Sequence, residues 1–375
     1  MRVRAAVVAV LAIVALVGPA GTDAAAETSD HVAVQQAMDD LVAAGATGVQ
    51  LRMRDETGTW TASAGVAERG RPEGVPVDGR FRIGSITKTF VATVLLQMVG
   101  EGRLGLDDPV ARHLPRLTLD ERITVRMILG HTSGLFDYTG RDTIDGTLQS
   151  PLSEDTAAVY RPEDLVRWAV SMPLRFEPGT EWRYSNTNYL MAGLLIEELT
   201  GLPYAAQVYL RIIVPLGLWG TEIPSPSAAI RGPHAHGYWP VGPDGAALDV
   251  TGWNPSWAGA AGEMISTTAD LDTFLAALAE GRLLAPHLMA EMQAFRPAPD
   301  ETLGYGLGLS ELKNRSGCHG IGHNGAIPGY YSWALSTPDG RRRVVMSVTD
   351  GAGNLGDEEY QTARIRPVIL AFCGS

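Results

Sequence analysis

The sequence predicts an α/β fold of the α+β type, in which both chain ends build one discontinuous antiparallel sheet around an inserted helical domain. Two observations predict it. Apolar and polar residues alternate at 49–54, before a second strand around Trp60, and stretches with strand character return at 304–312, 330–336 and 342–349. Residues 85–295 instead show helical periodicity interrupted by long loops rich in proline and glycine. We therefore expect a sheet domain from 27–84 and 296–375, flanked by terminal helices, and a mostly helical domain from 85–295.

Residues 1–26 have the features of a secretory signal peptide. Two arginines precede an uncharged run at 5–20, and three alanines at 24–26 provide a cleavage site. The mature chain would begin near Glu27, without a stable membrane span, and be secreted. The alternative is an N-terminal membrane anchor, for which the apolar run is marginal in length.

The first elements of the mature chain are expected to be a helix and a hairpin. Residues 31–44 place apolar side chains on one helical face, with a serine or aspartate cap at 29–30 and Gly45 at the end. Residues 49–53 then alternate, and a turn leads to a second strand around Trp60.

The C-terminal part supplies the remaining strands. Residues 304–312, 330–336 and 342–349 have strand character, and the last two are joined at a Pro-Asp-Gly turn. A closing helix over about 358–372 completes the sheet domain.

Composition excludes several classes of partner. The formal net charge of -12 and the pI near 5.1 leave no basic stripe for a nucleic acid, and an anionic membrane surface is equally disfavoured. With 45% hydrophobic residues in 375, the chain is able to bury one large core or two adjoining cores.

The two cysteines, Cys318 and Cys373, are expected to form a disulfide. In an oxidising compartment an even number of cysteines usually pairs, and this pair would tie the C-terminal end to the body. Two buried free thiols are the alternative.

Lysine is rare in this chain, which makes Lys88 informative. Only Lys88 and Lys313 occur among thirty basic residues. Ser85 lies three positions before Lys88, one helical turn away, and an apolar run follows. A buried lysine is able to share a proton with a serine hydroxyl, which arginine cannot, and so to activate a nucleophile. Ser310 precedes Lys313 at the same spacing, but in a polar stretch that we interpret as a strand end and solvated loop.

Two further stretches strengthen the interpretation of Ser85 and Lys88. Residues 184–186 (Tyr-Ser-Asn) stand on a loop before an apolar helix, and residues 323–325 (His-Asn-Gly) enter a strand. Alone, the first is typical of a loop cap and the histidine of the second is typical of a structural residue.

Together and in this order, these motifs resemble those of the secreted serine-type D-alanyl-D-alanine carboxypeptidases/transpeptidases of the kind found in Streptomyces, within the serine β-lactamase and penicillin-binding-protein family. The resemblance extends over roughly residues 30–374. It includes "GSITKTF", "HTSGLFDYT", "YSNTNYLMAGLLIEELTG", "SWAGAAGEMISTTADLDTF", "GYGLGL", "GHNG" and both cysteine contexts. It implies a β-lactamase/transpeptidase-like fold.

The resemblance also implies a role for individual residues. Ser85 corresponds to the acylated nucleophile, Lys88 to its proton partner, and Tyr184 to the phenolic base that relays a proton to the leaving group. Asn186 corresponds to an amide donor to the substrate carbonyl. The backbone N–H groups of Ser85 and Ala326 would form the oxyanion hole. The resemblance places six further residues at the substrate: Phe136, Thr139, Trp257, His323, Asn324 and Gly325.

Two positions depart from the family pattern. Asn324 stands where threonine or serine usually provides a hydroxyl, and Ser310 stands where the carboxypeptidases have an arginine. Both groups normally help to bind the substrate carboxylate, and charge-assisted bonds are the strong ones. We hypothesise that these changes favour esters, amides or D-aminoacyl substrates that lack a free carboxylate.

The activity implied by the resemblance is a D-alanyl-D-alanine carboxypeptidase/transpeptidase that acts on peptidoglycan stem peptides. A β-lactamase, an esterase or a D-aminopeptidase of the same fold is the alternative, and a weakly catalytic sensor of penicillins or peptidoglycan is a second. The ligands would be D-alanyl peptides or β-lactams, bound by a monomer without cofactor or metal.

Other hydrolase classes fit poorly. An α/β-hydrolase needs glycine two residues either side of its serine, a pattern that this chain lacks. A zinc hydrolase needs histidines at helical spacing, whereas His234 and His236 lie in a loop and His319 and His323 flank glycines.

Overall fold

The computed structural model describes residues 22–374, except for 141–142, 145–146, 154, 225–226, 241–245, 298–302, 314–316 and 352–357. Most of the expected signal peptide therefore lies outside the described residues. The helices are α1 (Thr22–Ala43), η1 (Gly84–Ile86), α2 (Thr87–Gly100), α3 (Val110–His113), α4 (Val125–Leu129), α5 (Pro162–Val170), α6 (Thr187–Thr200), α7 (Tyr204–Val208), η2 (Tyr209–Ile213), α8 (Val214–Leu216), η3 (Pro255–Trp257), η4 (Gly259–Ala261), α9 (Thr268–Ala279), α10 (Pro286–Met292) and α11 (Glu358–Cys373). The strands are β1 (Gly48–Arg54), β2 (Thr59–Gly65), β3 (Phe81–Arg82), β4 (Thr143–Ile144), β5 (Thr147–Leu148), β6 (Tyr238–Pro240), β7 (Ala247–Asp249), β8 (Ile265–Ser266), β9 (Arg296–Pro297), β10 (Leu303–Tyr305), β11 (Ser310–Lys313), β12 (His319–Ile327), β13 (Tyr330–Ser336) and β14 (Arg343–Thr349).

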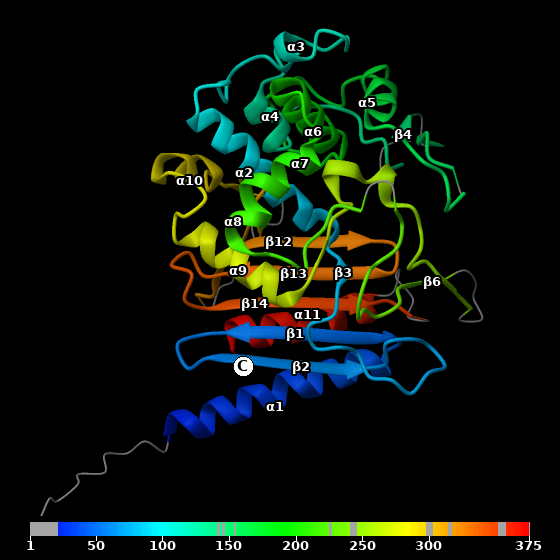
Figure 1. Ribbon diagram of the computed structural model, residues 1–375, viewed down its shortest axis with the longest axis vertical. Coiled ribbons are helices and arrows are strands. Elements are labelled where there is room, and N and C mark those ends of the chain that lie inside the picture. The colour runs from blue at the N-terminus through cyan, green and yellow to red at the C-terminus, as the bar shows by residue number, and fades with distance from the viewer. Residues whose placement is uncertain are drawn as a thin grey trace, which may run out of the picture.

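Strands from both chain ends form one antiparallel sheet (Figure 1). Within the described residues its order is β2-β1-β14-β13-β12-β11-β10-β9. β1 pairs with β14 along its full length, from Gly48 opposite Thr349 to Arg54 opposite Arg343. The predicted fold class, a discontinuous antiparallel sheet with an inserted helical part, is confirmed.

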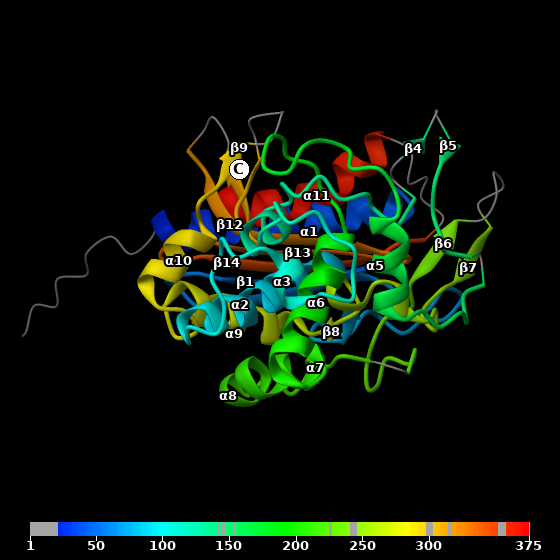
Figure 2. The same cartoon turned by 90° about the horizontal axis from the view of Figure 1, so that it is seen from above.

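The sheet is covered on both faces (Figure 2). α1 and α11 pack together on one face, while α9 and the helical part lie on the other. Alternation along the strands produces this arrangement, because Val49 and Leu51 of β1 and Met346 of β14 point into the core beneath α1 and α11. Val345, one position from Met346, joins the second core instead.

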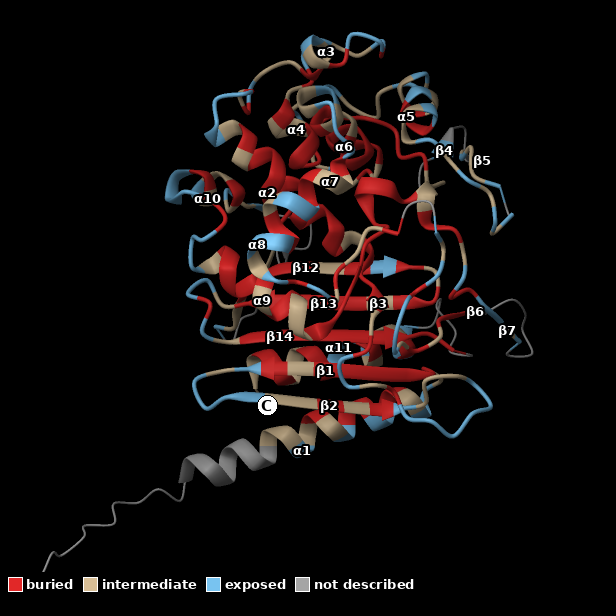
Figure 3. Cartoon of the chain, viewed as in Figure 1, coloured by how far each residue is buried: buried red, intermediate tan, exposed pale blue. Residues whose placement is uncertain are grey.

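The second core fills the helical part. α2 and α6 lie at its centre and are buried on nearly all sides (Figure 3). This explains why the sequences of both helices are apolar on nearly all sides instead of showing apolar residues on one face only. The residue that follows each helix, Glu101 and Gly201, marks the return of the chain to the surface.

Several element boundaries differ from the sequence prediction. α1 begins at Thr22, not after a cap at residues 29–30. The stretch predicted as one strand over 304–312 is divided into β10 and β11, because Gly308 has a φ of 73° and the N–H of Gly306 donates to the carbonyl of Leu309 across a turn. The long loop after α8 contains the β6–β7 hairpin.

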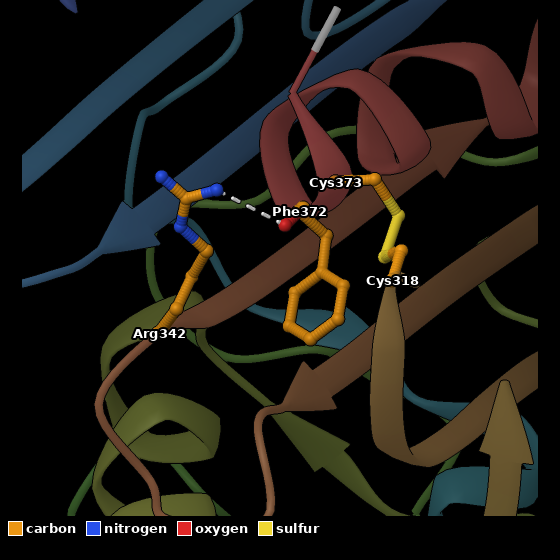
Figure 4. The surroundings of a disulfide bond; sticks show 4 residues. All are labelled: Cys318, Arg342, Phe372 and Cys373. Atoms are coloured by element: carbon orange, nitrogen blue, oxygen red, sulfur yellow. Dashed lines mark hydrogen bonds between the residues drawn. A yellow bond between two sulfur atoms is a disulfide. The ribbon is translucent and has the colours of Figure 1, made fainter. Parts of the chain in front are cut away.

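The disulfide between Cys318 and Cys373 is present, as predicted (Figure 4). It joins the start of β12 to the end of α11 over a sequence separation of 55 residues. Beside it, Arg342 donates a hydrogen bond of 3.2 Å to the carbonyl of Phe372. Within the part of the chain that the structure describes, no helix combines the length and apolarity needed to cross a bilayer.

Candidate active site

Ser85 lies at the junction of a short turn and a buried helix. The turn η1 leads directly into α2, so that Lys88 follows Ser85 by one helical turn. Gly84 has a φ of 51°, a left-handed conformation that suits glycine. The first backbone N–H groups of a helix lack partners within the helix, so a position at a helix start favours an anion.

The Lys88 ammonium is buried and holds three groups together. Its side chain is 0% exposed. Nζ donates to Ser85 Oγ at 3.0 Å, to Asn186 Oδ1 at 2.9 Å and to the carbonyl oxygen of Ala261 at 2.6 Å. These three acceptors match the three hydrogens of an ammonium group. Lys88 is therefore fixed in place by α6 and by η4 as well as by its own helix.

Tyr184 completes the set around the Ser85 hydroxyl. It comes from the loop before α6, and its OH donates to Ser85 Oγ at 2.8 Å. Lys88 Nζ lies 4.9 Å from the centre of the Tyr184 ring. Ser85 Oγ therefore has two titratable neighbours within hydrogen-bond reach, and either of them in its deprotonated form is placed to act as the general base that activates a nucleophile.

Asp137 holds the Asn186 side chain in one orientation. Asp137 is fully buried, and its Oδ2 accepts from Asn186 Nδ2 at 3.2 Å. Its Oδ1 accepts from the backbone N–H of Thr139 at 3.1 Å and from the Thr139 hydroxyl at 3.0 Å. With the amide nitrogen turned to Asp137, the amide oxygen faces Lys88.

Two buried histidines support the tyrosine side of the site. Tyr305 OH lies 3.2 Å from His131 Nε2 and 3.1 Å from His323 Nε2. The His131 ring packs against the Tyr184 ring at 4.2 Å. Burial and the nearby Lys88 charge lower the pKa of His323 to about 3 and hold the pKa of His131 well below its usual range.

The strand β12 approaches the Ser85 turn more closely than side chains would allow. β11 pairs with β12 only as far as Gly322, so the remainder of β12 is open towards η1. A Cβ on Gly84 would lie 2.7 Å from the Ala326 nitrogen, and a Cβ on Gly325 would lie 1.9 Å from the Ile83 carbonyl oxygen. These two glycines let the Ala326 backbone reach the side of Ser85, as an oxyanion hole requires.

A cavity of about 610 Å³ opens beside Ser85, within the size range of small-molecule sites. Its wall combines aromatic rings with few charges. The lining residues are Ser85, Tyr138, Thr139, Leu152, Ser153, Asp155, Tyr160, Asn186, Trp239, Trp253, Trp257, Ala258, Ala261, Gly262, Ala326, Ile327, Pro328, Tyr330, Asp350, Gln361 and Arg364.

The structure places the predicted substrate residues in two groups. Thr139, Asn186, Trp257 and Ala326 line the cavity together with Ser85. The other four are not among the residues that line this cavity: Phe136, His323, Asn324 and Gly325.

Each residue of the second group has another contact. The ring of Phe136 packs edge-on against Trp168. His323 binds Tyr305, and Asn324 bonds to Tyr331. Their contact with substrate stays a prediction, while their observed contacts support the wall.

Sequence reasoning missed several residues of the site. His131 and Asp137 lie inside the quoted stretch "HTSGLFDYT", so the signal was present but was not assigned to them. The role of the Ala261 carbonyl could not be predicted from the sequence, because every residue type has a backbone carbonyl. Trp239 and Trp253 were hidden in a loop rich in proline and glycine.

Comparison with known proteins agrees with this geometry. A family model described as Beta-lactamase matches residues 34–368. A crystal structure of a D-stereospecific amidohydrolase from Streptomyces sp. is similar, with a TM-score of 0.81 and 40% identity over 92% of this chain and 99% of that one. A D-amino acid amidase from Ochrobactrum anthropi is similar with a TM-score of 0.78 and 30% identity, covering 92% and 98%.

A curated relative is more distant. Penicillin-binding protein 4* of Bacillus subtilis is 27% identical over 81% of this chain and 67% of its own length. Because the family model matches most of the chain and a similar structure is 40% identical across nearly the whole fold, the chain belongs to the β-lactamase family, as a serine hydrolase.

Proposed function

We propose that this protein hydrolyses amides of D-amino acids through an acyl-enzyme on Ser85. The charge of the cavity wall carries the proposal. Among the described lining residues Arg364 is the one cation, and it already pairs with Asp350, while Asp155 adds a second carboxylate. Lys88 is buried, donates to three protein acceptors and does not line the cavity, so a free substrate carboxylate would find no unpaired cation among the described lining residues, whereas a neutral amide leaving group needs none.

The contacts at Ser85 support each step of acyl transfer. Ser85 Oγ bonds to the substrate carbonyl carbon as its proton passes to a base within reach, either the Tyr184 oxygen as phenolate or Lys88 Nζ as neutral amine. The backbone N–H groups of Ser85 and Ala326 receive the oxyanion. Tyr184 then returns a proton to the departing amine, and water hydrolyses the ester to release the acid.

The relatives' names favour D-aminoacyl amides over other substrates. The two similar structures reported above are described as a D-stereospecific amidohydrolase and a D-amino acid amidase. An esterase, EstB of Burkholderia gladioli, is 35% identical over a shorter span, 41% of this chain. Amide and ester substrates share the acyl-enzyme and differ only in the leaving group.

A D-alanyl-D-alanine carboxypeptidase/transpeptidase is the second candidate. The similarity to penicillin-binding proteins supports it. Asn324 and Ser310 oppose it, because neither replaces the hydroxyl or the guanidinium that would hold the terminal carboxylate. A binding sensor without turnover is less well supported, because the hydrogen bonds among Ser85, Lys88 and Tyr184 would then serve no purpose.

Secretion is a further part of the proposal. The disulfide supports it, because such bonds persist in oxidising compartments. The signal peptide that we propose for residues 1–26 lies mostly outside the described residues.

The test measures ammonia release from D-phenylalanine amide and its L-enantiomer by the purified mature protein. We expect release from the D-enantiomer, none from Ser85→Ala, and full activity in Ser171→Ala, a control at an exposed serine. Intact-mass spectrometry with benzylpenicillin and with a D-alanyl-D-alanine peptide runs in parallel. Release of D-alanine without turnover of the amide would replace the proposal with the second candidate.

A further inference from the structure

The cavity extends well beyond Ser85 along the end of β12. Ala326, Ile327 and Pro328 form one wall in succession. The turn that follows brings in Asp350, whose backbone N–H donates to the Gly329 carbonyl at 3.0 Å. Because an extended strand rises about 3.3 Å per residue, Pro328 lies roughly 7 Å beyond Ala326. The far end of the cavity is thus about two residues of extended chain from the oxyanion hole.

A buried pair of opposite charges, Asp350 and Arg364, forms this far end. The two side chains are 3% and 7% exposed, and Arg364 Nε lies 3.5 Å from Asp350 Oδ1. Tyr360 OH also donates to Asp350 Oδ1, at 3.1 Å. The Arg364 guanidinium stacks on the Tyr331 ring at 4.0 Å, which fixes its plane. Both residues are therefore held rigidly at the cavity wall.

The pair leaves hydrogen-bonding atoms unused. Asp350 Oδ2 and Arg364 Nη2 make no hydrogen bond to any residue that the structure describes, whereas Arg364 Nη1 donates to Gln361 Oε1 at 3.1 Å. Arg364 Nε is buried and also lacks a hydrogen-bond partner among the described residues, although buried polar atoms normally find one. A neutral group that offers both an N–H donor and a C=O acceptor, such as an amide, complements this arrangement better than an anion or a cation, each of which one member of the pair would repel.

The acyl side of a substrate runs towards this pair. Tyr184, which protonates the leaving group in the proposed mechanism, is in ring contact with Tyr305, and Tyr305 is bonded to His323. Along β12, His323 and Pro328 lie on opposite sides of Ala326. The leaving group therefore departs on the His323 side, and the acyl chain extends along Ile327 and Pro328.

We propose that Asp350 and Arg364 form a distal subsite that binds a peptide or N-acyl amide in the acyl chain, two residues from the reacting carbonyl. Asp350 Oδ2 accepts from the N–H, and Arg364 Nη2 donates to the C=O. This inference rests on the proposed amidase function and specifies its substrate preference, with peptidyl D-aminoacyl amides hydrolysed faster than free D-amino acid amides.

Three substrates test the subsite on the unmodified protein. Acetyl-D-phenylalanine amide lacks the distal amide, acetylglycyl-D-phenylalanine amide has it, and acetoxyacetyl-D-phenylalanine amide replaces its N–H by oxygen. We expect kcat/KM for ammonia release to rise about tenfold or more from the first to the second, as for hydrogen bonds to charged groups, and to fall back for the third. Equal values for all three would overturn the inference.

Variants then assign the effect to the pair. In the double variant Asp350→Asn/Arg364→Gln, which leaves no unpaired charge, the ratio of the second to the first substrate should fall towards one. Arg366→Gln, at an exposed residue on the same helix, should keep the ratio. An unchanged ratio in the double variant would refute the assignment. Failure of the proposed function is distinguishable, because no amide substrate, long or short, would then release ammonia.

Discussion

Lys88 shows how much one residue type reveals. Its rarity and its place three residues after a serine singled out the pair that we propose as reacting, and the structure brings both residues together with Tyr184. The remaining contacts of Lys88 could not be predicted in the same way. The Ala261 acceptor is a backbone carbonyl 173 positions away, and any residue type presents one.

The buried histidines make an acid-dependent contribution to stability. The pKa of His323 falls from 6.5 to about 3 on folding, so between these values the unfolded chain binds a proton that the folded chain does not. Stability from this residue is therefore complete above pH 6.5 and is lost progressively as the pH falls. From pH 7.5 to 5 the loss is about 2 kcal/mol.

Urea unfolding of His323→Gln measures this contribution. The variant should lose less stability than the wild type on going from pH 7.5 to pH 5, even if both differ by a constant offset. His287→Gln, at an exposed histidine, should follow the wild type. Parallel pH dependences for wild type and His323→Gln would contradict the prediction.

Among the elements, β12 links the sheet to the chemistry. Its neighbours β13 and β14 were predicted within a residue or so, because alternation and a Pro-Asp-Gly turn define them. The docking of β12 on the Ser85 turn was not visible in the sequence, since it depends on what a Cβ at Gly84 or Gly325 would meet in space. The hairpin β6–β7 was not predicted, because strands of three residues are too short to show a clear alternation of apolar and polar residues.

Gly325→Ala tests the close approach of β12. A Cβ there would lie 1.9 Å from the Ile83 carbonyl, so the strand must move away from the Ser85 turn. We expect a loss of about 1–3 kcal/mol of stability and a drop in kcat larger than any change in the amount of folded protein. Gly74→Ala, where a Cβ meets nothing within 4 Å, is the control and should be silent in both assays.

At the scale of the whole molecule, two cores meet across the sheet. One lies beneath α1 and α11, and the other fills the helical part. This arrangement supports the division that we propose, with boundaries near residues 84 and 296. The fold class could be predicted from the sequence because strand-like stretches occur near both ends of the chain. The start of α1 could not be predicted, because helix propensity alone does not locate a helix start that has no capping residue.

The disulfide should act on the stability of the whole chain rather than on catalysis. It closes a loop of 55 residues, and the loss of loop entropy in the unfolded state is worth about 4 kcal/mol. Cys318→Ser/Cys373→Ser should therefore unfold at lower urea with nearly unchanged kcat at 25 °C. A reducing agent should lower wild-type stability to the level of the variant and leave the variant unaffected. A variant as stable as the oxidised wild type would refute the estimate.

The pairing of β1 with β14 has a consequence in time. Ser85, the proposed nucleophile, is synthesised early, whereas Ala326, which we propose as part of its oxyanion hole, is synthesised much later. At about 5–20 residues per second, the nucleophile would exist for roughly 10–50 s before the strand that completes its site. A nascent or truncated chain therefore carries a serine that we expect to be unable to form an acyl-enzyme. Activity should appear only after the last tenth of the chain has been synthesised and β14 has paired with β1.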